Sequence, residues 1–205
     1  MVAISPDHIK YLAPHALPGL REAFGNAEAV LKKYGVNANG LRMSHFMAQV
    51  LHETRGLTVA VENLDYPADR IAEIWHYRFI NAMRAFPYSN APELLANRVY
   101  RNWMGNDQPG DGWRFIGRGL LQITGKGAYR TYGKAIGVNL LENPDLAAAP
   151  QFALQLAGAQ WDKNGCNDFA DNDNPRRITM ALHGALTEMA SRRTWLARTK
   201  DVWLR

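Results

Sequence analysis

Two glutamates, Glu53 and Glu62, have the residue type and the separation that could break a bond between two sugars. Such a reaction needs one carboxyl group that protonates the leaving oxygen and a second that attacks the anomeric carbon or activates water. In HFMAQVLHETRG the apolar residues recur at helical spacing, and Glu53 lies at the edge of the stripe they form. Apolar surroundings favour the protonated carboxyl that a general acid requires. Glu62 comes after Gly56, beyond the expected helix end, where the chain can fold back along a cleft.

The spacing of two glutamates does not by itself separate a site from solvated surface, where such pairs are common. A third feature, FIGRGLLQIT at residues 115–124, favours a site. In an extended segment Gln122 and Thr124 face the same side, and their amide and hydroxyl could hold a sugar substituent or a water. The glycines on either side of Arg118 could instead simply permit close backbone packing. Phosphate binding is not favoured, because neither GxxxxGK[ST] nor GxGxxG is present.

Metal and cysteine chemistry are both disfavoured by the sequence. The HExxH motif of zinc proteases is incomplete, because Gly56 stands where the second histidine is needed. His45 and His52 are expected on the opposite, solvent-facing side of the helix and are not expected to bind a metal. Cys166 is the single cysteine and has no evident base, so it is interpreted as a tolerated free thiol. We therefore expect no metal and no cofactor.

The elements that must position these residues are predicted to be helices almost throughout. Apolar periodicity, capping residues and Gly or Pro breaks predict helices near residues 27–34, 43–54, 68–79, 93–103, 150–161, 176–182 and from 187 onward. Residues 105–112 are predicted to form a loop, and residues 113–124 a short hairpin at most. Neither a repeat nor a linker divides the chain. The sequence predicts a mainly α fold with a single domain over residues 1–205.

The composition is that of a folded globular chain with an uneven distribution of charge. Of 205 residues, 47% are hydrophobic and 21% charged, and no apolar run reaches the ~20 residues that span a bilayer. The formal net charge of +5 lies entirely after residue 175, since the preceding residues balance. The basic residues of this segment are Arg176, Arg177, Arg192, Arg193, Arg198, Lys200 and Arg205. A localised basic segment indicates an anionic partner.

Five segments in chain order resemble glycoside hydrolase family 19, which holds the lysozyme-like chitinases: HFMAQVLHETRG, VENLDY, ANRVYRN, GDGWRFIGRGLLQITGKGAY and RRITMALHG. The similarity runs from about Leu41 to Gly184 and is greatest to the bacteriophage endolysin branch. It implies a lysozyme-like domain in which residues 67–105 form a small helical lobe across the cleft. It also implies that Glu53 is the general acid and Glu62 the base of an inverting reaction. Thr124 would help to position water, and Gln122, Arg118 and His183 would contact substrate.

Departures from the chitinase pattern favour peptidoglycan over chitin as the substrate. Gly127 and Ala128 stand where chitinases have an asparagine, and His183-Gly184-Ala185 replaces Asn-Gly-Gly. The predicted function is that of an endolysin that hydrolyses the β-1,4 bond between N-acetylmuramic acid and N-acetylglucosamine for lysis of the bacterial host. A chitinase and a lytic transglycosylase are the enzymatic alternatives. A basic nucleic-acid-binding protein is a distant one, because no recognisable nucleic-acid module is present.

The partners expected from the sequence are peptidoglycan glycan strands and an anionic wall polymer or outer-membrane surface. The last helix would dock on the core through an apolar stripe of Met189, Trp195, Leu196, Val202 and Trp203, and would turn its basic face outward. We expect no specific nucleic acid and a monomer. The N-terminus lacks a basic region followed by an apolar one, so synthesis in the host cytoplasm without a signal peptide and release through a membrane pore are expected.

Overall fold

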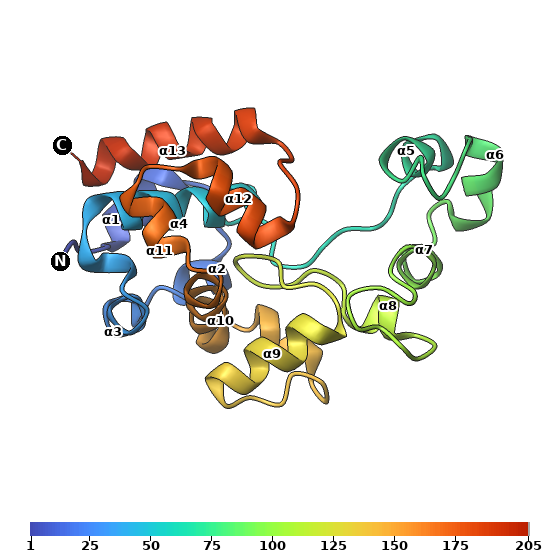
Figure 1. Cartoon of the computed structure of the whole chain (residues 1–205), viewed down its shortest axis with the longest axis horizontal. Coiled ribbons are helices and arrows are strands. Elements are labelled where there is room, and N and C mark those ends of the chain that lie inside the picture. The colour runs from blue at the N-terminus through green and yellow to red at the C-terminus, as the bar shows by residue number, and fades with distance from the viewer. Residues whose placement is uncertain (205) are drawn as a thin grey trace.

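The computed structural model describes residues 1–204, so Arg205 lies outside the described residues. Figure 1 shows two lobes joined by an extended segment and by a loop that runs between them. The helices of the large lobe are α1 (Pro6–Leu12), α2 (Pro18–Glu22), α3 (Ala27–Lys33), α4 (Gly40–Glu53), α9 (Lys126–Ile136), α10 (Pro150–Lys163), α11 (Cys166–Asp171), α12 (Pro175–His183) and α13 (Met189–Trp203). The small lobe has α5 (Ala68–Ile74), α6 (Ala82–Ala85), α7 (Pro92–Val99) and α8 (Asp111–Arg114). Three short 3-10 turns, η1 (Val36–Ala38), η2 (Phe86–Tyr88) and η3 (Pro144–Ala148), complete the elements.

Helix α4 is the centre of the large lobe, as its apolar periodicity predicts. The Asn39 side chain accepts a hydrogen bond from the backbone N–H of Arg42 and so caps the first turn. Met43, Phe46 and Val50 are fully buried in the main core, which α10 and α13 also enter. Helix α13 lies along α4 (Figure 1), with Leu196 and Trp203 buried beneath it. The predicted mainly α fold is confirmed.

The face of α4 that was expected to meet solvent is covered. The side chain of His45 is buried, with its Nε2 2.7 Å from Asp173 Oδ1, and that of His52 is only 8% exposed. The prediction of a solvent-facing surface for these two histidines is therefore wrong. The reason is tertiary: Asp173 precedes α12, and His52 contacts Ser191 on α13, so segments far along the chain cover this face.

The small lobe has a core of its own around Ile71, Leu95 and Val99. The helix predicted over residues 68–79 ends at Ile74, and the one predicted over 93–103 covers Pro92–Val99. Aromatic residues with modest helix propensity follow Ile74, and two of them, Trp75 and Phe79, are buried in the core of the lobe. Side-chain burial therefore decides the path of the chain here more than helix propensity does.

The predicted hairpin is reduced to two isolated antiparallel bridges, and no strand forms among the described residues. Arg118 pairs with Ile123 across a tight turn and with Val61 on the other side. The backbone N–H of Glu62 donates to the carbonyl of Gly117 at 2.8 Å. These few hydrogen bonds hold the extended segment that carries Glu62 against the 115–125 loop. No helix in the described part of the chain is long and apolar enough to cross a membrane.

Candidate active site

An open cleft of about 750 Å³ lies beside the C-terminal end of α4. Its lining includes all of the predicted site residues except Arg118: Glu53, Glu62, Gln122, Thr124 and His183. The remaining lining residues are His52, Arg55, Val59, Asn63, Tyr66, Gly117, Glu188, Ser191 and Trp195. The structure therefore brings both candidate acids, the amide, the hydroxyl and the histidine to one cavity, although they come from α4, the extended segment, the 115–125 loop and α12.

Glu53 is the last residue of α4, and its immediate neighbours are polar. Its Oε1 lies 2.6 Å from Nη2 of Arg192 and 3.3 Å from Nε2 of His183, and the side chain is 14% exposed. The contact with Arg192 is an ion pair without the alignment of a hydrogen bond. Burial lowers the pKa of His183 to about 3, and the positive charge of Arg192 adds to this effect. His183 is therefore neutral near pH 7. Glu53 is largely buried, as its place at the edge of the apolar stripe predicts, but its nearest partners are polar and not apolar.

Arg192 is a site residue that the sequence analysis counted as part of an outward basic face. Its side chain is 3% exposed, and it crosses from α13 to α4. Nη1 donates to Oε1 of Gln49 at 2.5 Å, and Nε donates to the carbonyl of Thr187 at 3.2 Å. A signal was present in the sequence, because Arg192 is spaced three residues from Met189 and four from Leu196. That spacing places it on the apolar stripe of the helix.

Glu62 is held by hydrogen bonds to both carboxylate oxygens. The hydroxyl of Tyr100 donates to Oε1 at 2.6 Å, and the backbone N–H of Gly117 donates to Oε2 at 3.1 Å. Burial raises the pKa of Glu62 above its ordinary value, and the two hydrogen bonds offset part of that rise. Burial and the neighbouring Glu62 raise the pKa of Tyr100 as well, so the phenol remains a donor.

Gln122 and Thr124 converge with Glu62 on Gly117. A Cβ atom added to Gly117 would lie 2.9 Å from Oε1 of Gln122, 3.2 Å from Oγ1 of Thr124 and 3.3 Å from Cβ of Glu62. Gln122 has a left-handed backbone (φ 50°), and its amide donates to the carbonyl of Gly119 at 2.8 Å. The hydroxyl of Thr124 donates to the carbonyl of Gln122 at 3.1 Å. The shared side predicted for Gln122 and Thr124 is present, but a turn creates it and not strand alternation.

Arg118 does not line the cleft, and the prediction that it contacts substrate does not fit the structure. Its Nη1 donates to the carbonyl of Arg114 at 2.9 Å and to the hydroxyl of Tyr129 at 3.0 Å. Its Nη2 lies 3.0 Å from Asp145 Oδ1, and the side chain is buried. The guanidinium thus ties the loop before the cleft to α9 and η3. Flanking glycines gave no information on the direction in which this side chain would turn.

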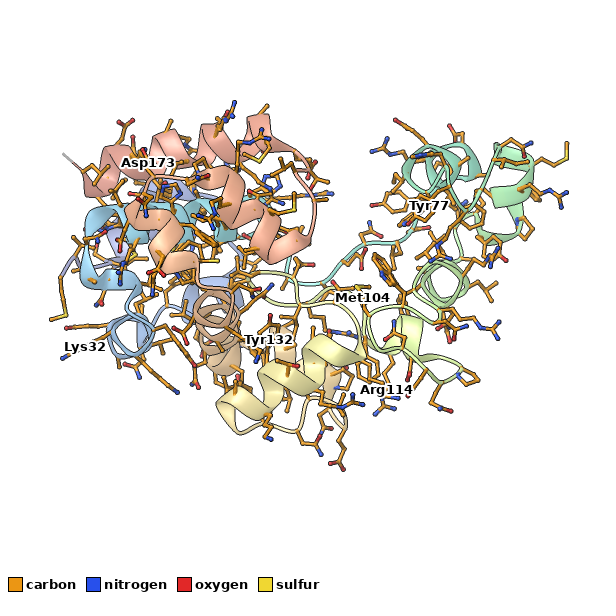
Figure 2. All side chains as sticks on the ribbon, viewed as in Figure 1. Lys32, Tyr77, Met104, Arg114, Tyr132 and Asp173 are labelled. Atoms are coloured by element: carbon orange, nitrogen blue, oxygen red, sulfur yellow. The ribbon has the colours of Figure 1, made fainter. Side chains whose placement is uncertain are left out.

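The loop after α7 presents an aromatic ring that stacks on Tyr100, the hydrogen-bond donor to Glu62. Trp103 is half exposed and stacks on Tyr100, with ring centroids 6.2 Å apart and an interplanar angle of 26°. The buried side chain of Asn106 fixes the loop by donating to the carbonyl of Tyr100 and accepting from the N–H of Lys126, both at 2.9 Å. Met104, labelled in Figure 2, packs directly on Gly125. A Cβ atom added to Gly125 would lie 2.4 Å from the Cβ atom of Met104, so only glycine fits there. The sequence patterns predicted no role for Tyr100 or Trp103 and did not indicate this packing.

Comparison with known proteins identifies the family. The family model for chitinase class I, glycoside hydrolase family 19, matches residues 21–167. This chain belongs to glycoside hydrolase family 19. A family 19 domain-containing protein of Haemophilus influenzae is 33% identical over 191 residues, which cover 92% of each chain. An endochitinase of Solanum tuberosum is 30% identical over 156 residues, which cover 71% of this chain and 42% of that protein.

A solved structure supports the fold of this family 19 hydrolase. Chitinase C from Streptomyces griseus superimposes with a TM-score of 0.63 at 21% identity, over 97% of this chain and 91% of that one. The lysozyme-like, all-helical architecture is thereby established. Within it, Glu53 and Glu62 have different environments, one beside a buried guanidinium and one desolvated beneath a phenol. The cleft therefore holds two carboxyl groups in different environments, and glycoside hydrolysis uses such a pair.

Proposed function

We propose that this family 19 hydrolase is an endolysin that cleaves the β-1,4 bond between N-acetylmuramic acid and N-acetylglucosamine in peptidoglycan, and so lyses the host cell. The observation that favours peptidoglycan over chitin as the substrate is the backbone packing at Gly127. Its N–H donates to the carbonyl of Met104 at 2.9 Å, and a Cβ there would approach the same oxygen to 3.2 Å. The asparagine that chitinases carry in this segment is absent, and the Met104 loop packs closely against the glycine backbone.

The proposed reaction is a single displacement with inversion. Glu53 gives its proton to the leaving glycosidic oxygen while the bond from that oxygen to the anomeric carbon breaks. Glu62 takes a proton from a water molecule, whose oxygen forms the new bond to the same carbon. Thr124 and Gln122 orient this water near the bare Cα of Gly117, and His183 contacts the substrate. Inverting enzymes hold the carboxyl groups roughly 6.5–9.5 Å apart, and we expect that separation between Glu53 and Glu62 when substrate is bound.

Chitin hydrolysis is the second candidate function. It is favoured by the similarity to the potato endochitinase and by the fold shared with chitinase C. The two functions differ in the substituents that the cleft must accept. Peptidoglycan carries a lactyl peptide on every second sugar, whereas chitin carries none.

The identity of the new chain end tests the proposal. Purified peptidoglycan and colloidal chitin would each be digested with the wild type and with Glu53→Gln, and the soluble fragments would be analysed by mass spectrometry. We expect muropeptides that end in reducing N-acetylmuramic acid, with a loss of about 10²–10⁴-fold in Glu53→Gln at unchanged circular dichroism. An anhydro end would indicate a transglycosylase, and a reducing N-acetylglucosamine end a glucosaminidase. Fragments released from chitin alone would replace the endolysin proposal with the chitinase one.

A further inference from the structure

The tip of the small lobe carries a group of bulky apolar side chains that no other part of the chain covers. Ile80, Met83 and Phe86 are 80%, 82% and 74% exposed, and Tyr77 is 62% exposed. They lie on α6 and on the turns at either side of it, and Tyr77 is labelled on this lobe in Figure 2. Isolated apolar residues are normal on a surface, but a contiguous group of this kind marks an interaction site. We call residues 77–86 the lobe tip.

The lobe tip itself carries positive charge and no acidic side chain, although Glu73 and Glu93 flank this segment of the sequence. From Ile74 to Pro92 the sequence has no Asp or Glu, whereas Arg78 and Arg84 lie within it. These two arginines and Arg98 line a cavity of about 710 Å³ together with Ile80 and Met83, and no acidic residue contributes to its lining. The Nε of Arg78 is buried and has no hydrogen-bond partner among the described residues. The site therefore offers donors to an anion next to an apolar surface.

The lobe tip is separate from the catalytic cleft. None of its residues lines the cavity that holds Glu53 and Glu62. Figure 1 shows α6 at the end of the small lobe that lies farthest from the large lobe. A glycan chain bound between the lobes would leave this surface free, so the apolar side chains are not explained by substrate binding.

We propose that the lobe tip binds to the surface of an anionic lipid bilayer. Ile80, Met83 and Phe86 would enter the boundary between headgroups and acyl chains, while the arginines would contact lipid phosphates. An apolar face flanked by basic residues is the pattern of interfacial membrane binding. A symmetric dimer through the same face would place these arginines opposite one another, with no acidic partner in the segment to neutralise them. The proposal does not depend on which glycan the enzyme cleaves.

Sedimentation with lipid vesicles tests this inference on the whole chain. Vesicles of phosphatidylcholine with phosphatidylglycerol would be compared with vesicles of phosphatidylcholine alone, at low and at moderate salt. The variants are Ile80→Ser with Met83→Ser and Phe86→Ser, and Arg78→Gln with Arg84→Gln. The matched control, Tyr11→Ser with Leu17→Ser, removes apolar side chains that are exposed on the large lobe. Circular dichroism and hydrolysis of soluble wall fragments, both expected to be unchanged, verify the fold and the cleft of every variant.

We expect the wild type and the control to bind anionic vesicles. The triple serine variant should bind at least about tenfold more weakly, because it lacks the three apolar side chains that would enter the bilayer. The double glutamine variant should lose most of the preference for phosphatidylglycerol. Equal binding by the wild type and the triple serine variant would overturn the inference. So would a wild type that does not bind anionic vesicles at low salt, or one whose apolar tip mediates only self-association in sedimentation velocity.

Discussion

At the scale of single residues, the hydrogen bond from Tyr100 to Glu62 determines how that carboxyl group titrates. Burial raises the pKa of Glu62, and the phenol at 2.6 Å lowers it again by stabilising the carboxylate. A general base works only in its ionised form. The acidic limb of the pH–rate profile should therefore follow the pKa of Glu62 and lie above the range of an ordinary glutamate.

Replacing Tyr100 by Phe should move that acidic limb to higher pH. Loss of the hydrogen bond favours the protonated carboxyl, so the pKa of Glu62 rises further and a larger fraction of the base is protonated at a given pH. A hydrogen bond to a charged group contributes about 1.5–3 kcal/mol, which corresponds to a shift of roughly one to two pH units as an upper range. The measurement is kcat/KM against pH on soluble wall fragments.

Tyr66→Phe is the matched control, since Tyr66 lines the same cleft and has no hydroxyl contact with Glu62 among the described interactions. Its acidic limb should coincide with that of the wild type. If Tyr100→Phe moved the alkaline limb instead, Glu62 would be the acid of the pair, and the roles of the two glutamates would be exchanged.

Thr124 should act as a positioning residue for water and not as a nucleophile. Thr124→Val keeps the shape of the side chain but removes the hydroxyl that lies near Gly117. We expect kcat to fall by about 10²-fold, because a misplaced reactant can reduce the rate to that extent. Thr124→Ser should retain most of the activity. Mass spectrometry of the intact protein during turnover should detect no glycosyl adduct, and finding one on Thr124 would contradict the single-displacement reaction.

At the scale of helices, the site depends on the packing of α13 against α4. Arg192 is the only described basic residue of α13 that is buried, and it links Gln49 to Glu53 across the helix pair. A guanidinium can meet two partners at once in a fixed plane, which a lysine ammonium cannot do. The carboxyl group of Glu53, which we propose as the acid, is thus held by a helix that begins 136 positions later, at Met189.

Arg192→Gln should lower both stability and turnover. Removing one partner of a buried ion pair typically costs about 3–5 kcal/mol, and the partial exposure of Glu53 places this case at or below the lower end of that range. Arg192→Lys should remain folded with reduced kcat, because it keeps the charge and loses the geometry. Urea unfolding and turnover would be measured together. Arg193→Gln, an exposed neighbour, should change neither, and an Arg192→Gln protein with normal stability and activity would refute the linkage.

At the scale of the whole molecule, the basic excess of the C-terminal segment is only partly available at the surface. Arg192 is buried in the site, Lys200 is 2.5 Å from Asp173, and the Arg198 guanidinium lies over the ring of Trp195. Arg177 is exposed but lies over the ring of Phe169, and Arg176 and Arg193 are exposed. We propose that these two residues attract the enzyme to an anionic wall polymer or outer-membrane surface, as the distribution of charge in the sequence suggests.

Charge reversal at Arg176 and Arg193 should therefore affect cells more than fragments. Arg176→Glu with Arg193→Glu should reduce lysis of outer-membrane-stripped cells at low salt and leave hydrolysis of short soluble fragments unchanged. Screening over about 10 Å at 0.1 M salt should remove the difference on cells. A variant that lyses cells as fast as the wild type at every salt concentration would leave these arginines as an ordinary solvated surface.

The sequence alone determined the elements that depend on local pattern. Apolar periodicity located α4 and its buried face, and capping and breaking residues indicated α3, α5, α7, α10, α12 and α13. The shorter helices α2, α6, α8 and α11, and also α9, were not predicted. The same pattern located Glu53 at the end of a helix and Glu62 beyond it. The motif FIGRGLLQIT singled out the segment that holds Gln122 and Thr124. These features follow from interactions between residues that are close in the chain, and such interactions can be predicted from the sequence pattern.

Only the tertiary structure decided which side chains meet. Tyr100 is 38 positions from Glu62, and Arg192 is 143 positions from Gln49. Helical spacing predicts that Arg192 lies on a buried stripe, but it does not predict that the carboxylate of Glu53 and the amide of Gln49 are its partners. Arg118 and His45 turned inward for the same reason, since a charged or polar side chain is buried only where distant segments supply its partners. Hydrogen bonding and charge pairing across the folded chain, which local propensity does not encode, therefore completed the site.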